Sequence, residues 1–127
     1  MATSIRMAKL LTKTNPGLVA LIGDLKQAAR ENDAPIWRDL AKRLSRASSR
    51  WAEVNLSRLE RYSAKGDILV VPGKLLGSGQ ISKPIKVAAF RTSKTAREKV
   101  EAAGGEVLEF RQLMREYPKG SGVRIMG

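Results

Sequence analysis

Arginine and lysine side chains gather in residues 42–62, the segment KRLSRASSRWAEVNLSRLERY, where only Glu53 and Glu60 are acidic. Guanidinium groups fork onto two phosphate oxygens, and small hydroxyl residues between them let a phosphate backbone approach closely. The chemistry that these residues can perform is therefore the binding of a polyanion through its phosphates.

The charge of the whole chain indicates the same kind of partner. Its 24 lysines and arginines outnumber its 12 acids and leave a formal charge of +12 on 127 residues. Self-repulsion on this scale is usually offset by a bound polyanion, and many phosphate contacts make such binding weaken steeply with salt. The alternative is a solvated basic face that only aids solubility.

The chain has no cysteine and no histidine. Disulfides, thiol nucleophiles, Cys/His zinc sites and His-based triads are thereby excluded. Acids such as Glu106 and Glu109 have no nucleophile or metal-ligand set beside them in the sequence. We expect no enzyme, no cofactor, no metal site and no small-molecule substrate.

The glycine-rich segment GKLLGSG, residues 73–79, follows an expected strand, which is where phosphate loops occur. It has neither the Lys-Ser/Thr ending of a P-loop nor the glycine spacing of a dinucleotide fingerprint. A structural turn or an RNA backbone contact through Lys74 is favoured. An enzyme that holds a phosphorylated ligand in this segment is the rival.

Helices are predicted to position the cations. Asn15-Pro16 and an apolar stripe from Leu18 predict a helix to about Glu31. Pro35 begins a second helix, whose apolar face lies opposite Arg38, Lys42 and Arg46. A third helix from about Asn55 to Ala64 sets Leu56, Leu59 and Tyr62 against Arg58, Arg61 and Lys65. Both flanking helices are thus expected to present cations beside the loop at 46–51.

Strands and helices alternate in the remaining sequence. Expected strands are 67–72, 85–90, 107–108 and 123–126, and expected helices are 94–103 and 110–117. The continuous apolar run ILVV in the first strand suggests that it is covered on both faces. We predict an α/β fold in which a basic arm (1–14) precedes one domain, helical over 15–65 and α/β over 66–127.

Aromatic residues make up only 5% of the chain, which leaves little material for stacking RNA bases. For Trp51, packing into the core is favoured over base stacking, because tryptophan is highly buried on average. Arg6 and Lys9 interrupt the first eleven residues, and no apolar run approaches about 20 residues. We expect a soluble, cytoplasmic protein without membrane contact.

Five strings resemble the archaeal and eukaryotic large-subunit ribosomal proteins of the eighteen-e family, which is related to bacterial large-subunit protein fifteen. They are LTKTNPGLVALI (11–22), ARENDAPIWRDLAKRLSR (29–46), AEVNLSRLERY (52–62), GDILVVPGKLLGSG (66–79) and GSGVRIMG (120–127). The resemblance implies a structural protein of the large ribosomal subunit that binds ribosomal RNA and neighbouring ribosomal proteins. It also implies an α/β fold described as an irregular superhelix of β-β-α turns.

In proteins similar to this one the basic N-terminal region lies against ribosomal RNA. The residues expected to bind RNA here are Lys9, Lys13, Arg38, Lys42, Arg43, Arg46, Ser48, Ser49, Arg50, Trp51, Asn55, Arg58, Arg61, Lys65 and Lys74. The six residues before Met7 exceed the usual family start, which makes Met7 an alternative first residue. A free nucleic-acid-binding protein of chromatin or regulatory type is the alternative function, although no DNA-reading motif is recognised.

Overall fold

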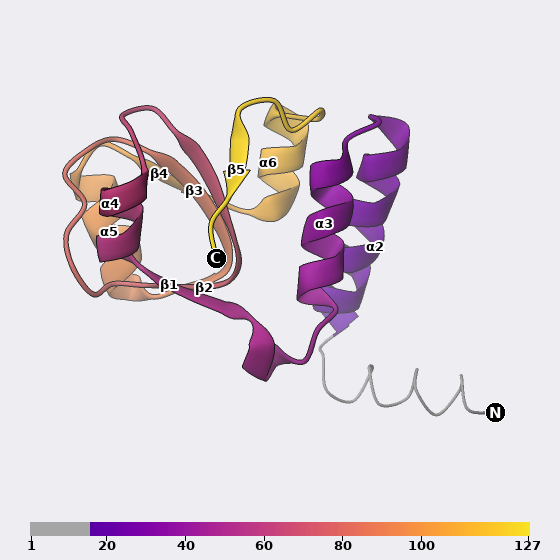
Figure 1. Cartoon of the computed structure of the whole chain (residues 1–127), viewed down its shortest axis with the longest axis horizontal. Coiled ribbons are helices and arrows are strands. Elements are labelled where there is room, and N and C mark those ends of the chain that lie inside the picture. Colours follow the sequence, from indigo (N-terminus) through magenta and orange to yellow (C-terminus); the bar gives the residue numbers. More distant parts are fainter. Residues whose placement is uncertain (1–15) are drawn as a thin grey trace.

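A sheet of five parallel strands lies between two layers of helices (Figure 1). The computed structural model describes residues 16–127. Its elements are α2 (Pro16–Glu31), α3 (Pro35–Leu44), a 3₁₀ turn η1 (Ser48–Arg50), β1 (Ala52–Asn55), α4 (Leu56–Tyr62), β2 (Ile68–Leu76), β3 (Lys86–Thr92), α5 (Lys94–Ala102), β4 (Glu106–Leu108), α6 (Phe110–Glu116) and β5 (Val123–Ile125). The predicted α/β class, with helices preceding the core, is confirmed.

Strand β2 organises the sheet. Strand β3 pairs with one edge of β2, and β4 pairs with β3 beyond it. The other edge of β2 is shared by two strands, because β5 pairs with residues 68–70 and β1 pairs with residues 73–76. The N-terminal half and the last strand of the chain therefore meet on one strand.

Alternate residues of the central strands face opposite helical layers. Val70 and Ala88 are buried against α2, α3 and α6, whereas Leu69, Val71 and Val87 are buried against α4 and α5. Figure 1 shows α4 and α5 to the left of the sheet and the other three helices to its right. The expectation that this apolar strand is covered on both faces is confirmed.

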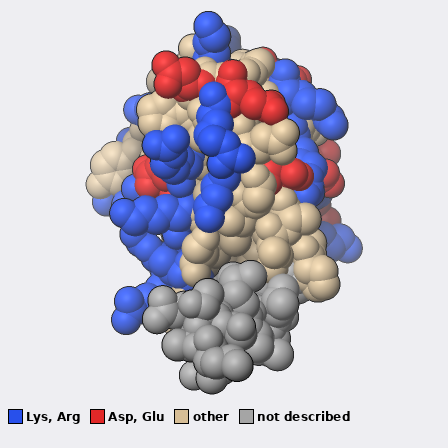
Figure 2. Space-filling view, turned by 90° about the vertical axis from the view of Figure 1, so that its right-hand side faces the viewer, with Lys and Arg blue, Asp and Glu red and all other residues tan. Residues whose placement is uncertain are grey.

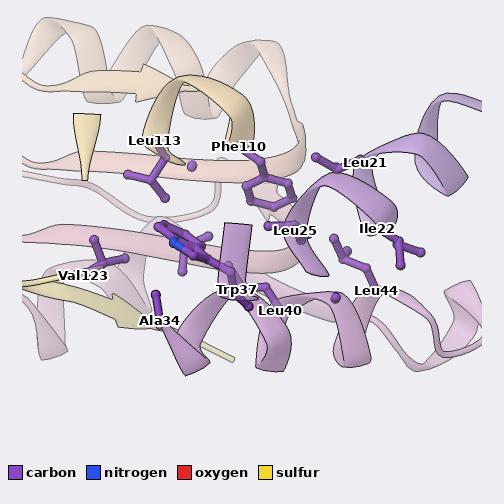
Figure 3. Packing of buried hydrophobic residues seen from close by; sticks show 14 of the residues in the cluster. Leu21, Ile22, Leu25, Ala34, Trp37, Leu40, Leu44, Phe110, Leu113 and Val123 are labelled. Carbon is purple, nitrogen blue, oxygen red and sulfur yellow. The ribbon is translucent and has the colours of Figure 1, made fainter. Parts of the chain in front are cut away.

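Helices α2 and α3 pack through the faces that their periodicity predicts. The stripe of α2 is buried throughout, at Leu18, Leu21, Ile22, Leu25 and Ala29. In α3, Leu40 and Leu44 are fully buried, and Trp37 joins them as the largest fully buried side chain. The Trp37 indole lies between α2, α3 and α6 in Figure 3 and donates a 2.7 Å hydrogen bond to the Pro118 carbonyl.

The sequence analysis missed strand β1 and half of β2. Residues 52–55 are extended rather than helical, and they pair with Gly73–Leu76, which the glycine-rich turn was expected to occupy. Four residues carry too little periodicity to reveal a strand. Pro72 lacks an N–H, and the β2–β3 register shifts between Val71 and Lys74, so β2 continues through a bulge that resembles a strand end in sequence.

Gly73 is required by the close approach of β1 to β2. A β-carbon at this buried position would lie 2.1 Å from the Ala52 carbonyl oxygen, a backbone atom that cannot swing away. Only a residue without a side chain therefore allows this strand pair.

We predict that Gly73→Ala lowers the free energy of unfolding by about 1–3 kcal/mol, because overpacking forces the two strands apart. Gly23→Ala is the matched control, since nothing lies within 4 Å of the added methyl group on α2. That variant should gain up to about 1 kcal/mol from helix propensity. Urea unfolding measures both, and equal effects would contradict the close approach of β1.

Candidate nucleic-acid interface

Helix α3 presents cations that its own acid does not neutralise. Arg38 and Lys42 are exposed, and their side chains have no hydrogen bond or ion pair within residues 16–127. Asp39, the single acid of α3, pairs instead with Arg43, whose Nε lies 3.2 Å from Asp39 Oδ1. Arg43 also donates from Nη1 to the Gly127 carbonyl at 3.1 Å, so it helps to hold the C-terminal end of the chain.

Trp51 closes the loop between α3 and β1. Its indole Nε1 donates to the Arg46 carbonyl at 3.1 Å, and its ring meets Phe90 edge-on at a centroid distance of 5.0 Å. The side chain is half-buried against the core, as the packing interpretation predicted. The closed loop leaves Arg46, Ser49 and Arg50 exposed, and Ser48 begins its 3₁₀ turn.

A second cationic group lies on α4. Arg58 and Arg61 are exposed, and Lys65 follows them just beyond the end of the helix. Ser57, Arg58, Arg61 and Tyr62 line a shallow hollow on the outer face of α4.

Tyr62 corrects the sequence analysis, which placed it on the apolar face with Leu56 and Leu59. Both leucines are fully buried, whereas Tyr62 is 56% exposed. The helix has only two turns and ends at Tyr62, beyond the core cluster that contains the two leucines. Helical periodicity cannot show where the layer beneath a helix ends.

Glu60, the single acid of α4, points to another segment of the chain. Its Oε2 accepts hydrogen bonds from Ser82 Oγ at 2.5 Å and from Ser82 N at 3.1 Å, and Lys83 Nζ lies 3.4 Å from Oε1. The hydrogen bond from the Ser82 side chain is the main reason that the pKa of Glu60 is lowered, and Lys83 adds to it. A carboxylate engaged in this way leaves Arg58 and Arg61 without an acid.

The two cationic groups lie on opposite sides of the sheet rather than side by side. Helix α3 packs with α2 and α6, and α4 packs with α5 on the other face. The expectation that both helices present their cations beside one loop is therefore wrong. The loop at 46–51 and strand β1 connect the two sides, as Figure 1 shows.

Figure 2 shows the side of the molecule where α2 and α3 lie. Cationic side chains run down one half of this face, and the acidic side chains gather mainly toward its upper part. Positive potential on this side is therefore concentrated rather than evenly mixed with negative charge.

The turn at 77–79 is closed by the protein itself. Lys99 Nζ donates to the carbonyls of Gly77 at 2.9 Å and Gly79 at 2.7 Å, and Asn55 Oδ1 accepts from Ser78 N at 3.3 Å. Gly79 has a φ of +92°, where its hydrogen faces Ser57 in α4. These contacts support a structural turn, and they engage the Asn55 side chain within the protein.

Lys74 lies on β2 opposite Glu53 of β1 and is half-buried. Lys9, Lys13 and the Asn15 helix cap lie outside the described residues. Within residues 16–127 no cluster of three potential metal-ligating side chains occurs, and no helix combines the length and apolarity needed to cross a membrane.

Comparison with known proteins identifies relatives over nearly the whole chain. A family profile that groups ribosomal proteins 50S-L15 and 50S-L18e with their 60S counterpart matches residues 53–108, which hold β1 to β4. Large ribosomal subunit protein eL18 of Archaeoglobus fulgidus is 47% identical over 91% of this chain and 99% of the relative. The same protein of Methanopyrus kandleri is 52% identical over 89% of this chain and 93% of the relative.

This chain belongs to the eL18 family. The resemblance stated from the sequence strings is confirmed. The eL18 family consists of ribosomal structural proteins rather than enzymes, so the expectation that the chain is not an enzyme is also confirmed. The matched profile covers the sheet strands β1 to β4, α4 and α5, while the eL18 relatives extend the match to α2 and α3.

We predict that the Glu60 contact makes stability pH-dependent. Because the folded-state pKa lies below 4.5, the carboxylate stabilises the fold above pH 4.5, and this contribution is lost as the pH falls through the lowered value. Urea midpoints measured from about pH 6 to about pH 3 should therefore fall less steeply in Glu60→Gln than in the wild type.

Glu98→Gln on α5 is the control, because Glu98 is exposed and has no hydrogen bond or ion pair within residues 16–127. That variant should follow the wild-type curve. A Glu60→Gln curve parallel to the wild type would show that Glu60 does not fix α4 to the segment at 82–83.

Proposed function

We propose that this chain is a structural constituent of the large ribosomal subunit that binds and stabilises ribosomal RNA through its basic residues. Its relatives carry the name of a large-subunit protein, which supports a place in the large subunit of the cytoplasmic ribosome, beside ribosomal RNA and other ribosomal proteins. The observation that carries the RNA-binding part is the state of the predicted cations.

Apart from Arg43, the cations expected to bind RNA between residues 38 and 74 have side chains without any hydrogen bond or ion pair in the described part of the chain. The acids nearest to them, Asp39 and Glu60, are engaged by Arg43, Ser82 and Lys83. A folded protein holds so many unneutralised charges at low free-energy cost only when an anion offsets their repulsion. Phosphates of a folded RNA supply that anion.

The arrangement on both sides of the sheet favours a wedge. Arg38, Lys42, Arg46 and Arg50 contact phosphates on one side, and Arg58, Arg61 and Lys65 contact phosphates on the other. The sheet and its helices keep the two groups apart at a fixed separation. Phosphate contacts carry no sequence information, so recognition rests on the three-dimensional shape of the RNA.

We predict that Arg46→Ala or Arg50→Ala weakens binding to protein-free large-subunit ribosomal RNA and flattens the slope of log K against log salt by about one. Both side chains are exposed, so the fold should remain intact. Filter binding over a series of salt concentrations measures the slope.

Arg97→Ala on α5 is the matched control, since it removes the same charge from an exposed position outside the predicted surface. Its slope should equal that of the wild type. Unchanged slopes in both Arg46→Ala and Arg50→Ala would remove the loop from the RNA contact surface.

The ribosomal assignment itself predicts co-migration with large subunits through a sucrose gradient at moderate salt, because contacts to shaped RNA and neighbouring proteins persist when loose ionic binding is screened. Immunodetection across the gradient locates the protein. Protein that stays at the top of the gradient would favour a free nucleic-acid-binding protein instead.

A further inference from the structure

The outer face of α4 carries four side chains that helical spacing brings together. Residues 57 and 61, and residues 58 and 62, are four apart, so they are neighbours on one face. They line the hollow made by Ser57, Arg58, Arg61 and Tyr62. None of the four side chains has a hydrogen bond or ion pair within residues 16–127.

Tyr62 is the exposed large hydrophobic side chain of the described residues, at 56% exposure. An aromatic ring left open to water between two guanidinium groups is well suited to stack on another flat ring, because arginine and tyrosine both contact the faces of nucleobases. The hydroxyl of Ser57 adds a polar group at the rim of the hollow.

The backbone under Tyr62 is held in place. Arg124 Nη2 donates to the Tyr62 carbonyl at 2.7 Å and lies 3.1 Å from Asp67 Oδ2. Lys83 Nζ donates to the carbonyls of Glu60 at 2.8 Å and Ser63 at 2.6 Å. The end of α4 is thus fixed from two other segments of the chain, and the ring position is set before any ligand arrives.

We propose that this hollow binds one unpaired nucleotide of the RNA, with its base stacked on the Tyr62 ring and its flanking phosphates on Arg58 and Arg61. The inference rests on the proposed function and adds a base contact to a surface otherwise expected to bind phosphates. Charge favours a nucleotide over a protein segment, because Glu60 is engaged with Ser82 and Lys83 and leaves both arginines to an anion.

The test compares full-length Tyr62→Ala, Tyr62→Phe and wild type in binding to protein-free large-subunit ribosomal RNA. Loss of one stacked base should weaken the affinity of Tyr62→Ala about 5- to 100-fold, whereas Tyr62→Phe keeps the ring and should stay within about twofold of the wild type. The salt slope of Tyr62→Ala should be unchanged, because no phosphate contact is lost. Arg58→Ala and Arg61→Ala should each flatten it by about one.

Ultraviolet cross-linking of the wild-type complex, followed by mass spectrometry, should place a nucleotide adduct on Tyr62. Affinity of Tyr62→Ala within about twofold of a tightly binding wild type would overturn the inference and leave the proposed function intact. Wild-type protein that fails to bind the RNA would overturn both. Unchanged RNA affinity with reduced incorporation into subunits would assign Tyr62 to a protein neighbour instead.

Discussion

Coverage of a parallel sheet on both faces is the constraint on which this molecule depends. Strand β2 is apolar on both sides, so α2, α3 and α6 must pack on one face and α4 and α5 on the other. The helices that carry cations are thereby separated by the sheet, and their basic sides point outward in different directions. A protein built in this way fills a space between RNA segments more readily than it grips a single groove.

The pairing of acids decides which cations remain available. Asp39 binds Arg43, Glu60 binds Ser82 and Lys83, and Asp67 binds Arg124. Each of these contacts joins or orders segments of the fold while it removes an acid from the neighbourhood of the exposed arginines. Structure and charge are therefore coupled, because the same ion pairs that fix α4 and the chain end leave the outer faces of α3 and α4 positive.

The sequence predicted the long elements and the basic character of residues 42–62, because amphipathic periodicity and charge are local properties. It did not predict β1, since four residues gain their strand conformation from pairing with Gly73–Leu76 across the sheet. Tyr62 was assigned to the core by spacing alone, although the packed layer ends one turn earlier. The separation of α3 from α4 depends on the chain crossing the sheet edge, which no local pattern records.

The central claim is that both cationic sides contact ribosomal RNA at once. The most direct measurement is an electron cryo-microscopy structure of the assembled large subunit containing this protein. The account predicts RNA phosphates within hydrogen-bonding distance of the Arg46 and Arg50 side, and of the Arg58 and Arg61 side, with the sheet between them. A subunit in which either side faces only solvent or another protein would contradict it.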